Sequence, residues 1–123
     1  MLRRALAIRE KALGPDNPDT ATSLNNLGGL LYSKGDCAGA EPLHRRALAI
    51  REKALGSDHP DTATSLDNLA ELLKFKGDYA GAEPLYRRAL AIDLTALGPN
   101  HPVTMTIRTN LQVLIDKKSA KQK

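Results

Sequence analysis

An internal repeat dominates this chain, because residues 3–44 recur almost letter for letter at 45–86. The repeat period is therefore 42 residues, and 33 of the 42 aligned positions are identical. A third copy begins at residue 87 and diverges before the chain ends. Repeats of this length with helical periodicity stack as solenoids, in which each unit buries its apolar face only against its neighbours. The repeat therefore limits the fold to a stacked array.

Each copy predicts two helices, which we name helix A and helix B. Helix A begins at Pro18, behind the cap residue Asn17, and ends at Gly35, since proline suits the first helical position and glycine the C-terminal turn. Its apolar positions lie three or four apart, at Ala21, Leu24, Leu27, Gly28 and Leu31. Helix B follows the cap residue Asp36. Its predicted inner face is Ala40, Leu43, His44, Ala47, Ile50 and Ala54.

The chain is therefore predicted to be an all-α solenoid of antiparallel helical hairpins, with two full repeats and a half repeat at each end. We expect one domain over 1–118, followed by a basic tail at 119–123. Its parts are a partial helix B half repeat at 1–17, full repeats at 18–59 and 60–101, and a capping helix at 102–118. The expected helices are 2–13, 18–34, 37–55, 60–76, 79–97 and 102–118.

The net charge of +4 does not indicate nucleic-acid binding once the charges are located. Four of the 18 basic residues lie near the C-terminus, which leaves 14 basic against 14 acidic residues in the body; they are Lys117, Lys118, Lys121 and Lys123. Within the body, Glu41 precedes Arg45 by four residues, the favourable order for a helical ion pair. The arginines are thus expected on a salt-bridged outer face.

Cysteine use and hydropathy favour a cytoplasmic location. Cys37 stands alone, so neither an intrachain disulfide nor a cysteine metal cluster is expected. No apolar run approaches the length that spans a membrane. The Arg-rich N-terminus is similar to a transit peptide, but the same string returns at 45–55 and is therefore a repeat helix.

No pattern in the sequence indicates catalysis. His59 and His101 precede prolines in loops, and His44 is replaced by Tyr86 one repeat later. No motif pairs a nucleophile with a base, and no glycine-rich phosphate loop occurs. We therefore expect a non-enzymatic protein without cofactor or metal.

The repeat resembles the tetratricopeptide motif in its spacing. The string Leu24-x2-Leu27-Gly28-x2-Leu31 is followed by Ala40-x3-His44 and then Pro60. The usual period is about 34 residues, and the extra residues here lie around LGPDNPDTA and LGSDHPDTA. That length, with RRALAIREKALG and NNLG, resembles the kinesin light chain type, and near-identical tandem copies resemble its bacterial members. The chain departs from the motif where Leu24 and Leu66 replace an early Trp and where Arg108 stands in the third copy.

The resemblance implies that helix A lines a concave groove and helix B faces outward. Asparagine recurs on helix A at 26, 68 and 110, once every 42 residues. Stacked hairpins would arrange these amides as a ladder, and an amide can pair with the backbone of an extended peptide of any sequence. Alternatively, these asparagines bond to the neighbouring helix or are solvated.

Further helix A residues complete the predicted groove, and their variation between copies suits a selective site. Tyr32 and Phe75 either form one apolar pocket for a ligand side chain or pack against the next hairpin. The predicted peptide-binding set is Thr22, Asn25, Asn26, Tyr32, Thr64, Asp67, Asn68, Glu71, Phe75 and Asn110.

The sequence therefore predicts a protein–protein interaction module that binds an extended peptide segment. The alternative is a structural, self-assembling solenoid piece that contacts itself or further repeats, with nucleic-acid binding a distant third. Met1 aligns with Leu43, so the chain starts within a helix B that has no helix A before it. Because the apolar face of that helix is covered on one side only, a homodimer is expected.

Overall fold

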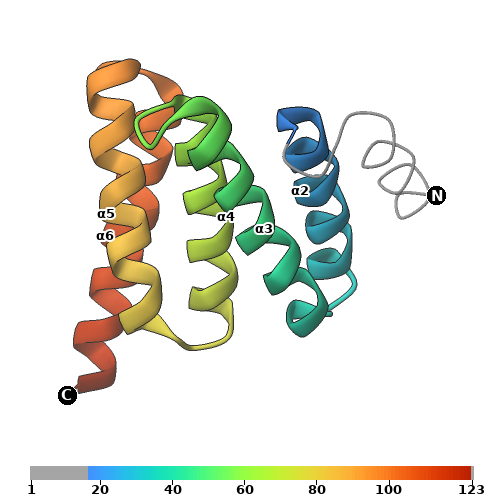
Figure 1. Cartoon of the computed structure of the whole chain (residues 1–123). Helices are drawn as coiled ribbons and strands as arrows, with labels where there is room; N and C mark the ends of the chain where they lie inside the picture. The colour runs from blue at the N-terminus through green and yellow to red at the C-terminus, as the bar shows by residue number, and fades with distance from the viewer. Residues whose placement is uncertain (1–16, 123) are drawn as a thin grey trace. The chain divides into compact units, whose positions relative to one another are not determined.

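The structure is a computed structural model that describes residues 17–122. Five helices follow one another along these residues, with no strand among them (Figure 1). Their bounds are Pro18–Ser33 (α2), Cys37–Leu55 (α3), Pro60–Phe75 (α4), Tyr79–Ala96 (α5) and Pro102–Gln122 (α6). The all-α prediction is confirmed, and α2 to α5 end within one residue of their predicted bounds. The helix predicted at 2–13 lies outside the described residues.

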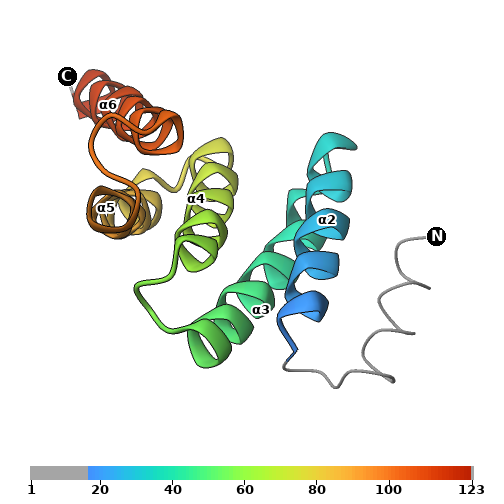
Figure 2. The same ribbon diagram turned by 90° about the horizontal axis from the view of Figure 1, so that it is seen from above.

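The helices form two compact units. The N-terminal unit, up to Ser57, holds α2 and α3, which pack against each other as a hairpin. The C-terminal unit, from Asp58, holds the hairpin of α4 and α5, and α6 packs against α5 (Figures 1 and 2). These units confirm the predicted helical hairpins, whereas the single domain over 1–118 stays a prediction. None of the described helices combines the length and the apolarity needed to span a bilayer.

Each helix A begins behind a side chain that accepts a backbone hydrogen bond. The donor is the N–H two residues further on, at 2.9 Å from Oδ1 of Asn17, 3.0 Å from Nδ1 of His59 and 3.1 Å from Nδ1 of His101. A proline follows each of the three residues, and its missing N–H is one that the first helical turn leaves unpaired. The two loop histidines therefore act as helix caps.

Each hairpin turn depends on a glycine in the left-handed region, with φ 85° at Gly35 and 88° at Gly77. After the first of these glycines, the N–H of Asp36 donates to the carbonyl oxygen of Leu31 at 2.8 Å. The Asp36 side chain then accepts from the N–H of Gly39 at 2.8 Å and caps α3. One Gly-Asp pair thus ends helix A and starts helix B.

The core of the N-terminal unit lies between α2 and α3. Its buried apolar residues are Ala21, Leu24, Leu27, Ala40, Ala47 and Ile50, with Leu43 packed beside them. Gly28 lies against the buried His44, because a Cβ added to Gly28 would be 2.7 Å from Nε2 of His44. Ala54 was expected on the inner face of α3 but is exposed, and the face buries Arg51 instead.

The core of the C-terminal unit draws on three helices. The α4 and α5 hairpin buries Ala63, Leu66, Leu69, Ala70, Leu73, Ala82, Tyr86, Ala89 and Ile92, and α6 adds Ile107, Leu111 and Leu114. On the other side of α6, Met105, Arg108 and Gln112 are exposed. They stand 42 residues after the buried Ala63, Leu66 and Ala70. The polar replacements Arg108 and Gln112 suit a helix that ends a stack.

Helix α6 is longer than predicted. It continues to Gln122, whereas the sequence suggested a helix that ends at 118 and a tail at 119–123. The reason is local, because Ala, Lys and Gln favour helix and no glycine or proline follows Pro102 to stop it. Residues 119–122 are therefore helical.

Ion pairs follow the outer side of each helix B. The distance from Nε of the arginine to Oε2 of the glutamate is 3.0 Å for Arg45 with Glu41 and for Arg87 with Glu83. In addition, Nζ of Lys118 lies 3.4 Å from Oε1 of Glu83 and joins α6 to α5. Hydrogen bonds from Arg87 and Lys118 lower the pKa of Glu83. The predicted helical ion pair of Glu41 and Arg45 is thus confirmed, and its counterpart in the next repeat also forms.

Candidate functional site

The predicted peptide-binding residues lie on helix A of each repeat. Four of them are on α2, five on α4 and one on α6. The set therefore divides between the N-terminal and C-terminal units. Within each unit, the hydrogen bonds show which of these side chains remain open to a ligand.

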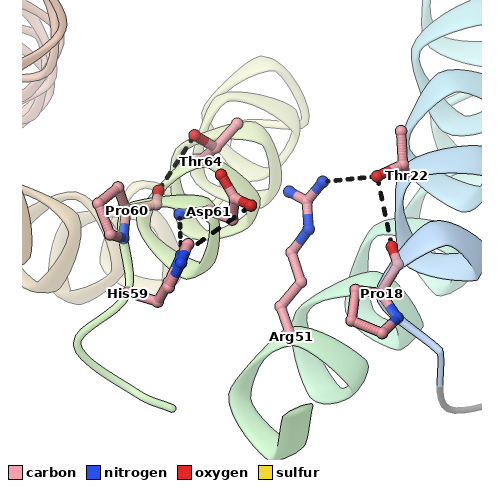
Figure 3. Close-up of polar contacts among 7 residues, drawn as sticks. All are labelled: Pro18, Thr22, Arg51, His59, Pro60, Asp61 and Thr64. Carbon is pink, nitrogen blue, oxygen red and sulfur yellow. Dashed lines mark hydrogen bonds and ion pairs between the residues drawn. The ribbon is translucent and has the colours of Figure 1, made fainter. Parts of the chain in front are cut away.

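Thr22 and Thr64 occupy the same repeat position near the starts of α2 and α4. Oγ1 of Thr22 donates to the carbonyl oxygen of Pro18 at 3.3 Å, and Oγ1 of Thr64 donates to that of Pro60 at 3.2 Å (Figure 3). The oxygen of Thr22 also accepts from Nη2 of Arg51 at 3.3 Å. Both hydroxyls use their hydrogens inside their own helices, so they can act toward a ligand only as acceptors.

Asn25 takes part in the internal structure of the N-terminal unit. Its Oδ1 lies 3.0 Å from Nδ1 of His44, which places the proton of the imidazole on Nδ1. Burial lowers the pKa of His44. Asn25 therefore orients a neutral core histidine, and the histidine in turn fills the space left by Gly28.

Asn26 and Asn68 differ from the other polar residues of the set. Asn26 is exposed and Asn68 is half-buried. Within residues 17–122, neither side-chain amide makes a hydrogen bond to another part of the protein. Among residues 17–122, both amides therefore leave their two donors and their acceptor unused, as binding of a ligand or of water requires.

Asn110, the third member of the predicted ladder, is engaged within the C-terminal unit. Its Nδ2 donates to Oδ1 of Asp67 at 3.4 Å, and this contact joins α6 to α4. The structure thus brings two predicted site residues together. For Asn110 the alternative of bonding to a neighbouring helix is realised, although one of its N–H groups remains available.

Asp67 has an unusual pKa. Burial is the main cause that raises it from 3.8 to about 6, and the negative charges of Glu71 and Asp93 act in the same direction. The hydrogen bond from Asn110 and the positive charge of Lys74 lower it. At neutral pH, Asp67 is therefore a largely ionised and only partly compensated carboxylate.

The remaining predicted residues are mostly accessible. Glu71 is exposed, and Phe75 exposes 66% of its surface near the end of α4, which is unusual for a large aromatic residue. Tyr32 is half-buried on α2, in the other unit. A shared pocket of Tyr32 and Phe75 therefore stays a prediction.

Sequence reasoning missed two residues, Arg51 and Asp93. They occupy the same position in successive repeats, and both are buried, with 8% and 1% of their surfaces exposed. Arg51 reaches Thr22, whereas the Asp93 carboxylate has no hydrogen-bond partner in the part of the chain that the structure describes. The signal that could have revealed them was a charge reversal between near-identical copies. Among the described residues, no group of His, Cys, Asp and Glu side chains could hold a metal ion.

Comparisons with known proteins agree on the type of repeat. A family model described as Tetratricopeptide repeat matches residues 1–53 and 29–95. No protein of curated function matches the chain significantly in sequence. One solved structure is that of a Podosopora anserina protein described as a kinesin light chain with nearly identical TPR-like repeats. It matches with a TM-score of 0.89 and 26% identity over 98% of this chain and 57% of its own.

Two further solved structures extend this similarity. A variant of the Podosopora anserina repeats matches with a TM-score of 0.85 and 26% identity, over 92% of this chain and 53% of its own. BtubC (BKLC) from P. vanneervenii matches with a TM-score of 0.85 and 25% identity, over 95% of this chain and 46% of its own. The chain spans about half the length of these structures. With its family model covering most of the sequence and its hairpins matching these structures, the chain belongs to the tetratricopeptide repeat family and has repeats of the kinesin light chain type.

Proposed function

We propose that this chain is a non-enzymatic module that binds an extended segment of a partner protein along helix A of its repeats. Tetratricopeptide repeats in general mediate protein–protein interactions, which supports the class of function. One observation carries the proposal of a peptide ligand. Asn26 and Asn68 stand 42 residues apart on successive helices A, and their amides are unpaired within the described part of the chain.

An unpaired amide on each repeat suits the backbone of an extended peptide. A peptide backbone presents one N–H and one C=O per residue, and an asparagine side chain can satisfy both at once. The affinity that results is independent of the ligand's sequence. Selectivity then comes from the residues that differ between repeats, such as Glu71 and Phe75.

The test begins with selection of peptides from a random displayed library on the full chain, followed by calorimetry with the selected peptides. Changing Asn26 and Asn68 together to Ala should weaken binding by a few kcal/mol, since up to four hydrogen bonds are lost and each contributes roughly 0.5–1.5 kcal/mol. The matched control is Asn100→Ala, in an exposed loop, which should leave the affinity unchanged. Equal affinity for the double variant and the parent chain would refute the role of the amides.

The library also tests the structural alternative. A self-assembling solenoid piece should select no peptide, and its mass in solution should rise with concentration. Selection of peptides by a chain of constant mass would instead support the interaction module.

A further inference from the structure

Three carboxylates of the C-terminal unit come from adjacent helices. Asp67 on α4 is half-buried and accepts from Asn110 on α6 at 3.4 Å. Glu71 lies one turn further along α4 and is exposed. Asp93 on α5 is buried, with 1% of its surface exposed, and its charge acts on Asp67. We name these residues the acidic site.

The acidic site differs from a surface cluster of carboxylates because one member, Asp93, is buried. Neither oxygen of its carboxylate has a hydrogen-bond partner within residues 17–122. The backbone of Asp93, in contrast, is hydrogen-bonded. Its carbonyl oxygen accepts from Oγ1 of Thr104 at 3.3 Å and from the N–H of Leu97 at 2.8 Å. A buried carboxylate without a partner is costly, so a positive charge nearby would be stabilising.

The basic side chains that act on the acidic site are fewer than its three carboxylates. Lys74 on α4 acts on Asp67, and His101, which precedes α6, acts on Asp93. Lys118 on α6 pairs instead with Glu83 on α5. Three carboxylates therefore face one lysine and one histidine.

The equivalent positions of the N-terminal unit have the opposite character. Asn25, Gly29 and Arg51 stand 42 residues before Asp67, Glu71 and Asp93. The first repeat therefore carries one basic residue where the second carries three acidic ones. The reversal occurs between copies that are otherwise almost identical, so it distinguishes one repeat chemically from the other.

We propose that Asp67 and Glu71 of the acidic site bind a cationic side chain, lysine or arginine, of the ligand peptide, and that the buried Asp93 adds its negative charge to the attraction. The proposal rests on the peptide-binding function proposed above and specifies its ligand. Asp67 keeps an oxygen that Asn110 does not use, and the carboxylate of Glu71 lies in solvent. Together they offer acceptors of the kind that a guanidinium or an ammonium group prefers.

The first experiment uses the full chain and small probes in place of a peptide. Nα-acetylarginine amide is titrated at pH 7 while NMR follows the side-chain amide of Asn110, and the neutral citrulline analogue serves as the control probe. The arginine probe should shift the Asn110 resonances in a saturable way and the citrulline probe should not. Equal shifts with both probes, or none with either, would overturn the proposal.

Variants then test whether the arginine probe binds at Asp67 and Glu71. The double variant Asp67→Asn and Glu71→Gln should abolish the shift, whereas Asp116→Asn, which removes an exposed charge from α6, should preserve it. Asparagine already occupies the position of Asp67 in the first repeat, so the variant should fold, and circular dichroism checks that it does. A shift that persists in the folded double variant would contradict the proposal.

The peptide library separates this inference from the function on which it rests. Selected peptides should contain lysine or arginine at one recurring position, and Asp67→Asn should weaken their binding by roughly tenfold or more, because hydrogen bonds between charged groups are the strong ones. Selected peptides without a basic residue would overturn the acidic site and leave the interaction module intact. If no peptide is selected, both proposals fail.

Discussion

At the scale of single residues, Gly28 and His44 show how closely the hairpin of the first repeat is packed. The added methyl of Gly28→Ala would meet Nε2 of His44, and Asn25 holds that ring in place. We expect the substitution to lower the free energy of unfolding by about 1–3 kcal/mol, as other overpacked sites do. Urea unfolding followed by circular dichroism measures this change.

Gly29 supplies the matched control, because a Cβ there would meet nothing within 4 Å. Gly29→Ala should stabilise the chain by about 0.5–1 kcal/mol, since alanine favours a helix more than glycine does. Similar effects at the two positions would show that His44 does not constrain Gly28.

A second prediction at the scale of residues concerns Asp67 of the acidic site and the pH dependence of the free energy of unfolding. Burial raises the pKa of Asp67 to about 6, so between about pH 4 and 6 the folded state binds more protons than the unfolded state. The free energy of unfolding should therefore rise as the pH falls through this window. A shift of about two pKa units corresponds to at most about 3 kcal/mol.

Asp67→Asn cannot titrate and is the control. The difference in unfolding free energy between the parent chain and this variant should change between pH 7 and pH 4, with the parent chain gaining. Parallel pH profiles for the two proteins would show that Asp67 titrates normally. Binding of a cationic probe should weaken over the same window, because protonation removes the charge that attracts it.

At the scale of elements, one face of α6 holds this helix against the rest of the C-terminal unit. Leu114 is buried, while the adjacent Val113 exposes 39% of its surface. Leu114→Ala should destabilise the chain by about 2–5 kcal/mol, and Val113→Ala should have an effect of about 0.5 kcal/mol or less. Thermal unfolding of the two variants tests whether α6 is held by this face.

The C-terminal end of α6, from Lys117 onward, is expected to contribute little to folding. Deleting residues 117–123 removes the contact of Lys118 with Glu83, and exposed ion pairs contribute about 0–1 kcal/mol. The shortened chain should therefore fold normally and lose any weak retention on DNA, since the excess positive charge lies in this segment. Strong, salt-sensitive DNA binding by the shortened chain would instead indicate that the paired arginines of helix B bind the DNA.

At the scale of the whole molecule, we predict that the isolated chain self-associates. Near-identical repeats allow a hairpin from a second chain to replace the native one at little cost. Exposed apolar side chains on α6, such as Met105, provide further contact surface. Light scattering over a concentration series should show a mass that rises toward that of a dimer. A constant monomeric mass would favour a self-sufficient peptide-binding module.

The sequence alone determined the helices and the pairing of helices within a repeat. Both depend on local features, namely the caps Asn17 and Asp36, the left-handed Gly35, and apolar spacings of three and four. The extent of α6 was less predictable, because no stop signal marks its end. The positions of Asn26 and Asn68 on the helix surface also followed from helical spacing alone.

Tertiary structure decided which polar side chains remain open. Asp67 and Asn110 are 43 residues apart, and their hydrogen bond requires that α4 and α6 meet beside α5. Tertiary packing also buries Arg51 on α3 and Asp93 on α5, which no hydrophobic pattern would place inside. Helical periodicity specifies the face on which a residue lies, whereas its partners and its pKa depend on the side chains that neighbouring helices bring to that face.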